Sequence, residues 1–256
     1  MAGCAQSHMR LILSRMRREP DLRGYAVTHP SGPLIPPQAA GWHQLIYAVS
    51  GVLVVDTAEG RWTLPRHRAL WVPAGVAHRL RVVHRSALRI LYAGERARLL
   101  PAGCRVLDVP PLLRELVVHL VEHAPMSLDE PRHARLVAVL QDLLVELPAD
   151  AALLLPAPVD TRAMAATELV TDLDVAAVCR RVGVGRRTLE RLFLAETGMS
   201  IGQWRRRRRM LDAVAHLAGG LPVADVALRV GYTTPSAFSA AFRTELGMSP
   251  SRWQPS

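Results

Sequence analysis

The sequence contains no lysine and only three cysteines in 256 residues. Cys4, Cys104 and Cys179 are odd in number and far apart, so they predict neither a disulfide framework nor a zinc site, and a reducing, cytoplasmic setting fits them best. No uncharged apolar run reaches the roughly 18 residues of a membrane-spanning helix, so no membrane partner is expected. Residues 1–21 lack the apolar region and cleavage site of a signal peptide, and we interpret them as a flexible tail.

The positive charge is spread unevenly along the chain. All 32 basic residues are arginine, and the formal net charge is +10. Residues 161–256 contain 14 arginines and 8 acidic residues (14 − 8 = +6), whereas residues 1–160 contain 18 and 14 (18 − 14 = +4). Codon usage can explain why arginine replaces lysine, but it does not explain the positive excess. The C-terminal third is the more basic part, as a nucleic-acid-binding segment would be.

The type of periodicity changes along the chain. Half of the residues are hydrophobic, so the chain can bury sizeable cores. Residues 22–105 contain short β-branched and aromatic runs separated by glycine and proline, which predicts a sandwich or barrel. Residues 110–123 and 131–147 change to helical periodicity, and helices fill the chain after a linker. The pattern predicts an α+β protein of two domains.

Two stretches near the C-terminus resemble each other. They are "GVGRRTLERLFLAETGMS" (183–200) and "GYTTPSAFSAAFRTELGMSP" (231–250), which lie 49 residues apart when Phe193 is aligned with Phe242. A short helical pattern precedes each copy, so the expected shape is helix, glycine-containing turn, helix, twice over.

Capping signals delimit these expected helices. Asp174 and Thr234 suit helix N-caps, and glycine suits left-handed turns and helix ends. The positions concerned are the turn glycines Gly183 and Gly231, the terminal glycines Gly198 and Gly247, and a capping box formed by Ser200 and Gln203.

The second helix of each unit has an apolar and a polar face. In the first unit, Leu189, Leu192 and Phe193 are expected to face the core, opposite Arg187, Glu190 and Arg191. In the second unit, Phe238, Ala241 and Phe242 are expected inside, and Ser236, Ser239, Ala240 and Arg243 outside. Such a face can be an ordinary solvated surface, but its duplication within a basic segment favours DNA binding. Arginine pairs with guanine through two hydrogen bonds, and glutamate accepts from cytosine.

We therefore assign base and phosphate contacts to these outer faces. The expected base-reading residues are Arg187, Glu190, Arg191, Ser236 and Ser239, and the expected phosphate contacts are Arg186, Thr234 and Arg243.

The helix between the copies, 201–218, would span roughly 27 Å at about 1.5 Å per residue. This is close to the ~34 Å repeat of a duplex, so it could set two helices into successive major grooves. Arg205 to Arg209 point around this helix, and we expect most of them to be solvated.

The C-terminal region resembles the AraC/XylS family of bacterial transcription regulators. The resemblance covers about residues 170–253, and "GYTTPSAFSAAFRTELGMSPSRW" is close to the signature of that family. The resemblance implies that the outer-face residues named above read DNA, and this implication is strongest for Arg191. The sequence departs from the family pattern at Gly185, where a hydroxyl cap is usual, at Arg208, which is normally apolar, and at Ala240, which is often polar or basic.

The strand-rich half looks like a cupin barrel, the usual sensory partner in this family. Gln44 stands where the cupin pattern has a glutamate ligand, Gln38 and Ala40 stand where it has histidines, and only His78 of the motif Pro-x-Gly-x-x-His remains. One imidazole does not hold a metal, so we expect no metal, no cofactor and no catalytic residue. His43 should face away from Gln44. His67 and His84 have no partner pattern and are interpreted as surface residues.

Tyr47 and Trp71 lie on strands expected to line the barrel. With His78 they are the candidate residues for a pocket that takes a small organic effector. The alternative is that the aromatic residues fill the core and His78 is structural.

The complete expectation is a cytoplasmic one-component regulator. Its cupin-like barrel and following helices precede an all-α domain of two helix-turn-helix units (174–198 and 222–247) joined by a linker helix. The expected partners are double-stranded DNA, an unidentified effector and a second copy of the chain, with RNA polymerase a further candidate. The alternatives are a degenerate cupin enzyme fused to a DNA-binding module and a DNA-binding protein without a ligand.

The expected segments of the chain are a tail (1–21), a barrel (22–105), a connecting and dimerisation segment (106–150), a linker (151–160) and a DNA-binding domain (161–256).

Overall fold

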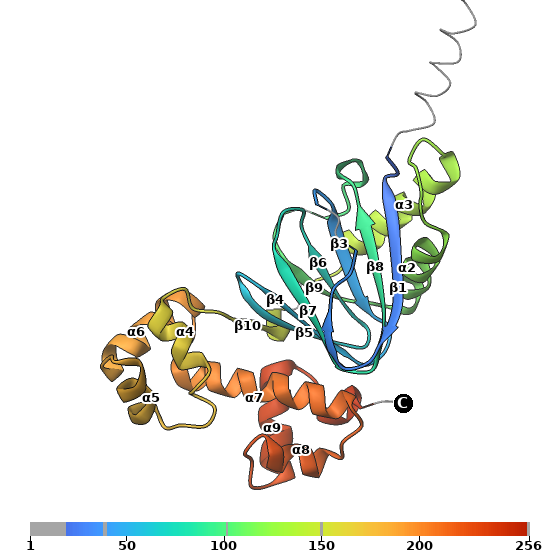
Figure 1. Ribbon diagram of the computed structural model, residues 1–256. Helices are drawn as coiled ribbons and strands as arrows, with labels where there is room; N and C mark the ends of the chain where they lie inside the picture. Colours follow the sequence, from blue (N-terminus) through green and yellow to red (C-terminus); the bar gives the residue numbers. More distant parts are fainter. Residues whose placement is uncertain (1–18, 38–39, 101, 149–150, 255–256) are drawn as a thin grey trace, which may run out of the picture.

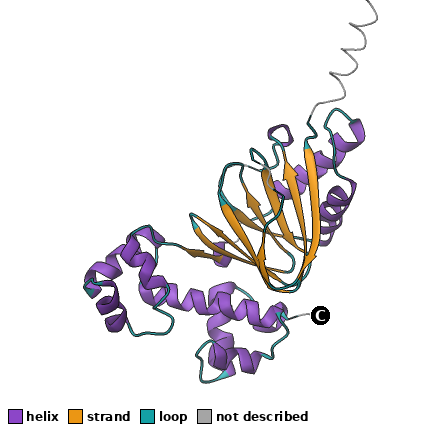
Figure 2. Ribbon diagram, in the orientation of Figure 1, coloured by secondary structure: helices purple, strands orange, loops and turns teal. Residues whose placement is uncertain are grey.

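The computed structural model describes residues 19–37, 40–100, 102–148 and 151–254. A sheet-rich N-terminal domain is followed by an all-helical C-terminal domain (Figure 1; Figure 2). The expected α+β architecture of two domains is confirmed.

The N-terminal domain, called the sheet domain below, consists of two antiparallel five-stranded sheets. The first has the order β1 (Leu22–His29), β8 (Ser86–Ala93), β3 (His43–Ala48), β6 (Arg68–Val72) and β9 (Arg105–Asp108). The second has the order β10 (Leu154–Pro156), β5 (Gly60–Pro65), β4 (Val52–Thr57), β7 (His78–His84) and β2 (Gly32–Leu34).

The two faces of the first sheet lie in different hydrophobic cores. Ile46 and Leu70 point into the interior between the sheets, where they join Leu53 and Leu64 of the second sheet. The opposite face of the first sheet packs against helices α2 (Pro111–His123) and α3 (Pro131–Val145). The first sheet is therefore apolar on both faces, and its strands read as nearly continuous apolar runs.

Helix α2 approaches the backbone of β1 very closely. A Cβ atom added at Gly24 would lie 2.3 Å from the carbonyl oxygen of Val121. The beginning of β1 is also anchored, because buried Asp21 accepts hydrogen bonds from the backbone N–H of Leu128 (2.7 Å) and from Arg96 (3.2 Å).

The C-terminal domain contains six α-helices among the described residues. They are α4 (Thr161–Thr167), α5 (Val175–Val182), α6 (Arg186–Thr197), α7 (Ile201–Ala218), α8 (Val223–Arg229) and α9 (Pro235–Leu246). A short 3-10 helix, η3 (Pro250–Trp253), ends the described chain. Helix α7 lies between the sheet domain and the last two helices (Figure 1).

The segment expected to be a plain linker extends a sheet instead. Residues 154–156 form β10, which pairs antiparallel with β5. Leu155 is buried, and the backbone carbonyl of Pro156 accepts a hydrogen bond from the indole N–H of Trp204 on α7 (2.8 Å). The apolar side chain of Leu155 explains the docking, because a solvated linker would leave it in water.

Further contacts join α7 and the chain end to the sheet domain. His84 is half-buried, and its Nε2 lies 3.0 Å from the carbonyl oxygen of Ala215 on α7. The interpretation of His84 as a surface residue is wrong, because the contact crosses between domains and has no local sequence pattern. Arg66 donates to the carbonyl oxygen of Gln254 (2.8 Å) in the same interface.

None of the helices in the described ranges is both long and apolar enough to cross a membrane.

We expect Gly24→Ala to lower the free energy of unfolding by about 1–3 kcal/mol, because α2 or β1 must move to admit the methyl group. Gly202→Ala is the control, since the added Cβ has no neighbour within 4 Å and alanine favours the helix by up to about 1 kcal/mol. Urea unfolding of both variants checks the pair. Equal stability of Gly24→Ala and the parent would contradict the close packing.

Candidate nucleic-acid interface and effector pocket

The two helix-turn-helix units have the turns and caps that the sequence predicts. Asp174 accepts a hydrogen bond from the backbone N–H of Ala177 (2.8 Å), and Thr234 accepts one from Ala237 (3.2 Å). Gly183 and Gly231 have φ angles of 71° and 84°, which are left-handed conformations. At Gly185, the N-cap of α6, no side chain caps the helix.

The recognition helices also end where the sequence predicts. Gly198 follows α6 with φ 70°, and Gly247 follows α9 with φ 73°. The capping box at the start of α7 is present, because Ser200 and Gln203 each accept a hydrogen bond from the backbone N–H of the other (3.3 and 2.8 Å). The geometry of both units is thus defined by local hydrogen bonds.

The apolar faces of α6 and α9 are buried. Leu189 and Phe193 of α6 are fully buried, and so are Phe238 and Phe242 of α9. The exposed residues at the start and outer face of these helices are Arg186, Arg187, Arg191, Thr234, Ser236, Ala240 and Arg243, whereas Ser239 is half-buried. Every expected DNA contact of these two helices except Glu190 and Ser239 is therefore open to solvent.

Glu190 is engaged within the protein. Its side chain is half-buried, and Oε2 accepts a hydrogen bond from the backbone N–H of Ile201 (3.2 Å). That N–H belongs to the first turn of α7, where a carboxylate also interacts favourably with the helix dipole. The base-reading role of Glu190 stays a prediction, and in this structure its carboxylate joins α6 to α7.

The arginine run of α7 is less solvated than expected. Arg205 donates from its guanidinium to the carbonyl oxygens of Val170 and Leu173, and Arg207 forms an ion pair with Glu245 of α9 (2.8 Å). These partners come from elements distant in sequence, so the spacing within the run gave no sign of them.

The remaining members of the run differ in exposure. Arg208 pairs with Asp212 one turn along the helix (3.2 Å). Arg209 is half-buried beneath Gly231, and Arg206 is exposed. At least three of the five arginines therefore have defined partners within the DNA-binding domain.

A pocket of about 630 Å³ opens at one end of the sheet domain. Its walls are largely apolar, and Trp42, Gln44, His78 and Arg79 are the residues that give it chemical character. Gln44 is 9% exposed, and among the described residues its Oε1 has no hydrogen-bond partner. His78 Nδ1 lies 2.9 Å from the carbonyl oxygen of Val76, which requires the proton on Nδ1 and leaves Nε2 as an acceptor in the neutral ring.

The expectation that Tyr47 and Trp71 line the barrel interior is wrong. Both are buried in the core between the first sheet and helices α2 and α3. Side chains alternate along a strand, so on β3 Gln44 and Ile46 face inward and Tyr47 faces the helices. Burial there raises the pKa of Tyr47.

Trp71 is packed in the same outer core. It stacks on His43 with ring centroids 5.1 Å apart, and His43 accepts a hydrogen bond from the backbone N–H of Ala74 (3.1 Å). His43 therefore faces away from Gln44, as the sequence predicts. The pocket residue that was missed is Trp42, whose even spacing from Gln44 could have identified it.

In the described part of the chain, no three His, Cys, Asp or Glu side chains are placed to hold a metal ion together. Of the positions that the cupin pattern gives to ligands, Gln38 lies outside the described residues, and Ala40 and Gln44 border the pocket together with His78.

Comparison with known proteins gives a match for each of the two domains. Residues 19–166 match the model of the AraC-like ligand binding domain, and residues 178–256 match the model of a helix-turn-helix domain. The chain is 32% identical over 215 residues to the HTH-type transcriptional regulator NimR of Escherichia coli (strain K12), covering 82% of this chain and 78% of NimR. The chain belongs to the AraC family of transcription regulators.

Other similar proteins match more narrowly or more remotely. The HTH-type transcriptional regulator RipA of Corynebacterium glutamicum is 36% identical over 100 residues, covering 38% of this chain and 30% of RipA. Among solved structures, unsaturated fatty acid-bound ToxT of Vibrio cholerae is 11% identical with a TM-score of 0.37, covering 93% of this chain and 96% of that chain.

Membership in the AraC family establishes the roles of the two domains. The C-terminal domain is a helix-turn-helix DNA-binding domain, and the sheet domain is a ligand-binding domain. The matched ligand-binding region extends from the sheets across α2, α3 and β10 to α4. It therefore includes the three parts that the sequence analysis treats separately as a barrel, connecting helices and a linker.

Proposed function

We propose that this AraC-family regulator reads DNA mainly through Arg187 and Arg191 of α6. Both side chains are exposed on the face opposite the buried Leu189 and Phe193, and no described residue forms an ion pair with them. A free guanidinium on a helix that enters the major groove can donate two hydrogen bonds to one guanine. This exposed, unpaired arginine face is the observation that carries the proposal.

The second unit would contribute mostly phosphate contacts. Arg243 and Ser236 are exposed on α9, and Thr234 keeps its hydroxyl proton free because its oxygen acts as the acceptor in the N-cap. Arg186 at the start of α6 would bind phosphate in the same way. Ser236 and Ser239 have short side chains, so we assign them a minor share of base reading.

We also propose that the effector occupies the pocket bounded by Trp42, Gln44 and His78. A buried amide oxygen without a partner destabilises the free protein, and a ligand that donates a hydrogen bond to it removes that cost. The apolar walls, the acceptors of Gln44 and His78 and the guanidinium of Arg79 suit a small, largely apolar organic molecule that carries polar groups. Binding would shift the relative populations of arrangements of the DNA-binding domains.

A second copy of the chain is the proposed partner of the α2–α3 layer. Leu112 of α2 is 63% exposed, and Val139 and Val145 of α3 are 45% and 72% exposed. Apolar side chains gathered on one helical layer are typical of an association surface. We further infer that the protein acts in the cytoplasm, that RNA polymerase is a candidate partner, and that it regulates without catalysing a reaction, as its relatives are regulators.

Arg191→Ala should weaken binding to the preferred site by roughly 1–3 kcal/mol and relax the preference at one base pair. Arg243→Ala should weaken binding to all sequences alike and reduce the slope of affinity against salt. Fluorescence anisotropy at several salt concentrations, with sites selected from random DNA, distinguishes the two. Unchanged affinity of Arg191→Ala, or a sequence-selective loss in Arg243→Ala, would contradict the assignment.

Gln44→Leu should leave the free protein as stable as the parent or stabilise it by roughly 1 kcal/mol, because it removes a buried amide oxygen without a partner. It should also abolish the effector response in a reporter assay. Gln141→Leu is the matched control, since Gln141 donates to the carbonyl oxygens of Ala97 (2.7 Å) and Arg98 (3.3 Å), and its loss should cost about 1 kcal/mol. If both variants lose stability equally in urea unfolding, the amide of Gln44 is structural and the pocket assignment fails.

A further inference from the structure

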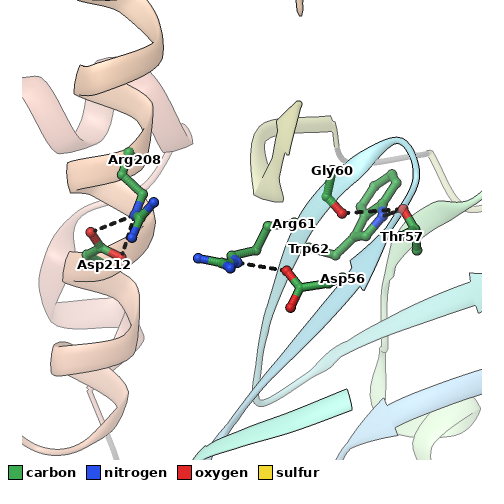
Figure 3. Close-up of polar contacts among 7 residues, drawn as sticks. All are labelled: Asp56, Thr57, Gly60, Arg61, Trp62, Arg208 and Asp212. Carbon is green, nitrogen blue, oxygen red and sulfur yellow. Dashed lines mark hydrogen bonds and ion pairs between the residues drawn. The ribbon is translucent and has the colours of Figure 1, made fainter. Parts of the chain in front are cut away.

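A second cavity, of about 450 Å³, lies between the sheet domain and the DNA-binding domain. Strands β4, β5 and β7 form one wall, and helices α7 and α8 form the other. Figure 3 shows part of it, with Arg61 of β5 extending toward the helix that carries Arg208 and Asp212. We call it the interdomain cleft. It is separate from the pocket at Gln44, with which it shares no lining residue.

Arginine is the dominant charged residue of the interdomain cleft. Five arginines line it: Arg61 and Arg81 from the sheet wall, and Arg208, Arg209 and Arg229 from the helical wall. Only two acidic residues, Asp172 and Asp212, are part of the lining. The formal charge of the lining is therefore +3 (5 − 2), with histidine counted as neutral.

The carboxylate of Asp56, which lies outside the lining, lowers this excess to +2 (5 − 3). Asp56 pairs with Arg61 (2.8 Å) and Asp212 pairs with Arg208 (3.2 Å), as Figure 3 shows. Within the described ranges, Arg81, Arg209 and Arg229 form no ion pair. Guanidinium groups therefore face one another across the boundary between the two domains, and their repulsion opposes the close approach of those domains.

The other groups of the interdomain cleft agree with a positive environment. His216 of α7 faces the cleft, and its pKa is lowered, first by burial and then by the charge of Arg229. Thr63 and Thr171 add hydroxyl groups to opposite sides of the lining. Guanidinium forks and hydroxyls are the groups that proteins use to bind carboxylate and phosphate oxygens.

We propose that the interdomain cleft binds a small multivalent oxyanion, either a phosphate ester or a polycarboxylate. Such an anion would bridge Arg81 of the sheet wall and Arg209 of the helical wall, and it would compensate the excess of +2 that remains when Asp56 is counted with the lining. A single carboxylate would neutralise only half of that charge. The site lies between two walls of the same chain, and its volume suits a metabolite rather than a duplex.

Occupancy would couple metabolite concentration to DNA binding. The anion contacts both β7 and α7, and α7 also contacts α6 and α9, which carry the DNA-facing side chains. An occupied cleft would hold α7 against the sheet domain, whereas an empty cleft would leave the arginines to repel each other. This goes beyond the effector pocket, because neither Gln44 nor His78 takes part.

Isothermal titration calorimetry of the full chain tests the proposal with two probes, pyrophosphate and citrate, at constant ionic strength. We expect one saturable site per chain for at least one probe. Arg81→Gln and Arg209→Gln should each weaken that affinity by about tenfold or more, because each removes a charged hydrogen-bond donor. Binding of pyrophosphate alone would identify a phosphate ester as the ligand class, and binding of citrate alone would identify a polycarboxylate.

Arg206→Gln is the matched control, because Arg206 is exposed on the same helix and does not line the interdomain cleft. It should bind the probes as the parent does. The proposal is overturned if neither probe saturates below about 10 mM, or if Arg206→Gln loses as much affinity as Arg209→Gln. It is also overturned if Arg81→Gln weakens binding to all DNA sequences in the absence of either probe, since Arg81 would then be a phosphate contact. The Gln44→Leu variant should retain anion binding, so failure here is distinguishable from failure of the effector pocket.

Discussion

The packing of α7 is the constraint on which the rest of the structure depends. Trp204 at its start meets the ring of Phe193 of α6 edge-on (5.8 Å between centroids), and Met210, Val214 and Leu217 continue its buried face. This continuous helix contacts α6, α8, α9 and the sheet domain, so it fixes the two helix-turn-helix units to each other and to the ligand-binding domain. The ion pair of Arg207 and the bonds of Arg205 add polar connections at its sides. A change in the docking of α7 would therefore move both DNA-facing helices.

The domain boundary combines attractive and repulsive elements. The strand β10 and the hydrogen bond of His84 hold the domains together, and buried residues of both domains belong to one hydrophobic cluster. Like-charged guanidinium groups, those of Arg81 and Arg209, lie on the two sides of this boundary. An interface balanced in this way has a small difference in free energy between its arrangements, so a ligand with modest differential affinity can shift them. That balance gives a sensory domain a physical means of affecting DNA binding without chemistry.

Local signals predicted the DNA-binding domain well, and long-range contacts account for most of what was missed. The turn at Gly183, the capping box at Ser200 and the buried Phe193 and Phe242 follow from short-range patterns, and the duplication strengthened each of them. Tyr47 was placed on the wrong face of its strand, because the first sheet is covered on both sides and β3 shows no polar alternation. The carbonyl partners of Arg205 and the contact of His84 with α7 depend on tertiary packing, which one sequence does not reveal.

The central claim is that α7 holds two DNA-binding helices at a fixed separation and orientation. Once footprinting has located the two contacted segments of a selected site, five base pairs inserted between them test this directly. Half a turn of the duplex moves the second segment to the opposite side of the helix axis. A rigid connection therefore predicts that one unit loses its contacts and that affinity falls tenfold or more. Inserting a full turn, in contrast, separates the segments without rotating them. Equal affinity for the original and the five-base-pair site would contradict the account, because it would show that the two units bind independently.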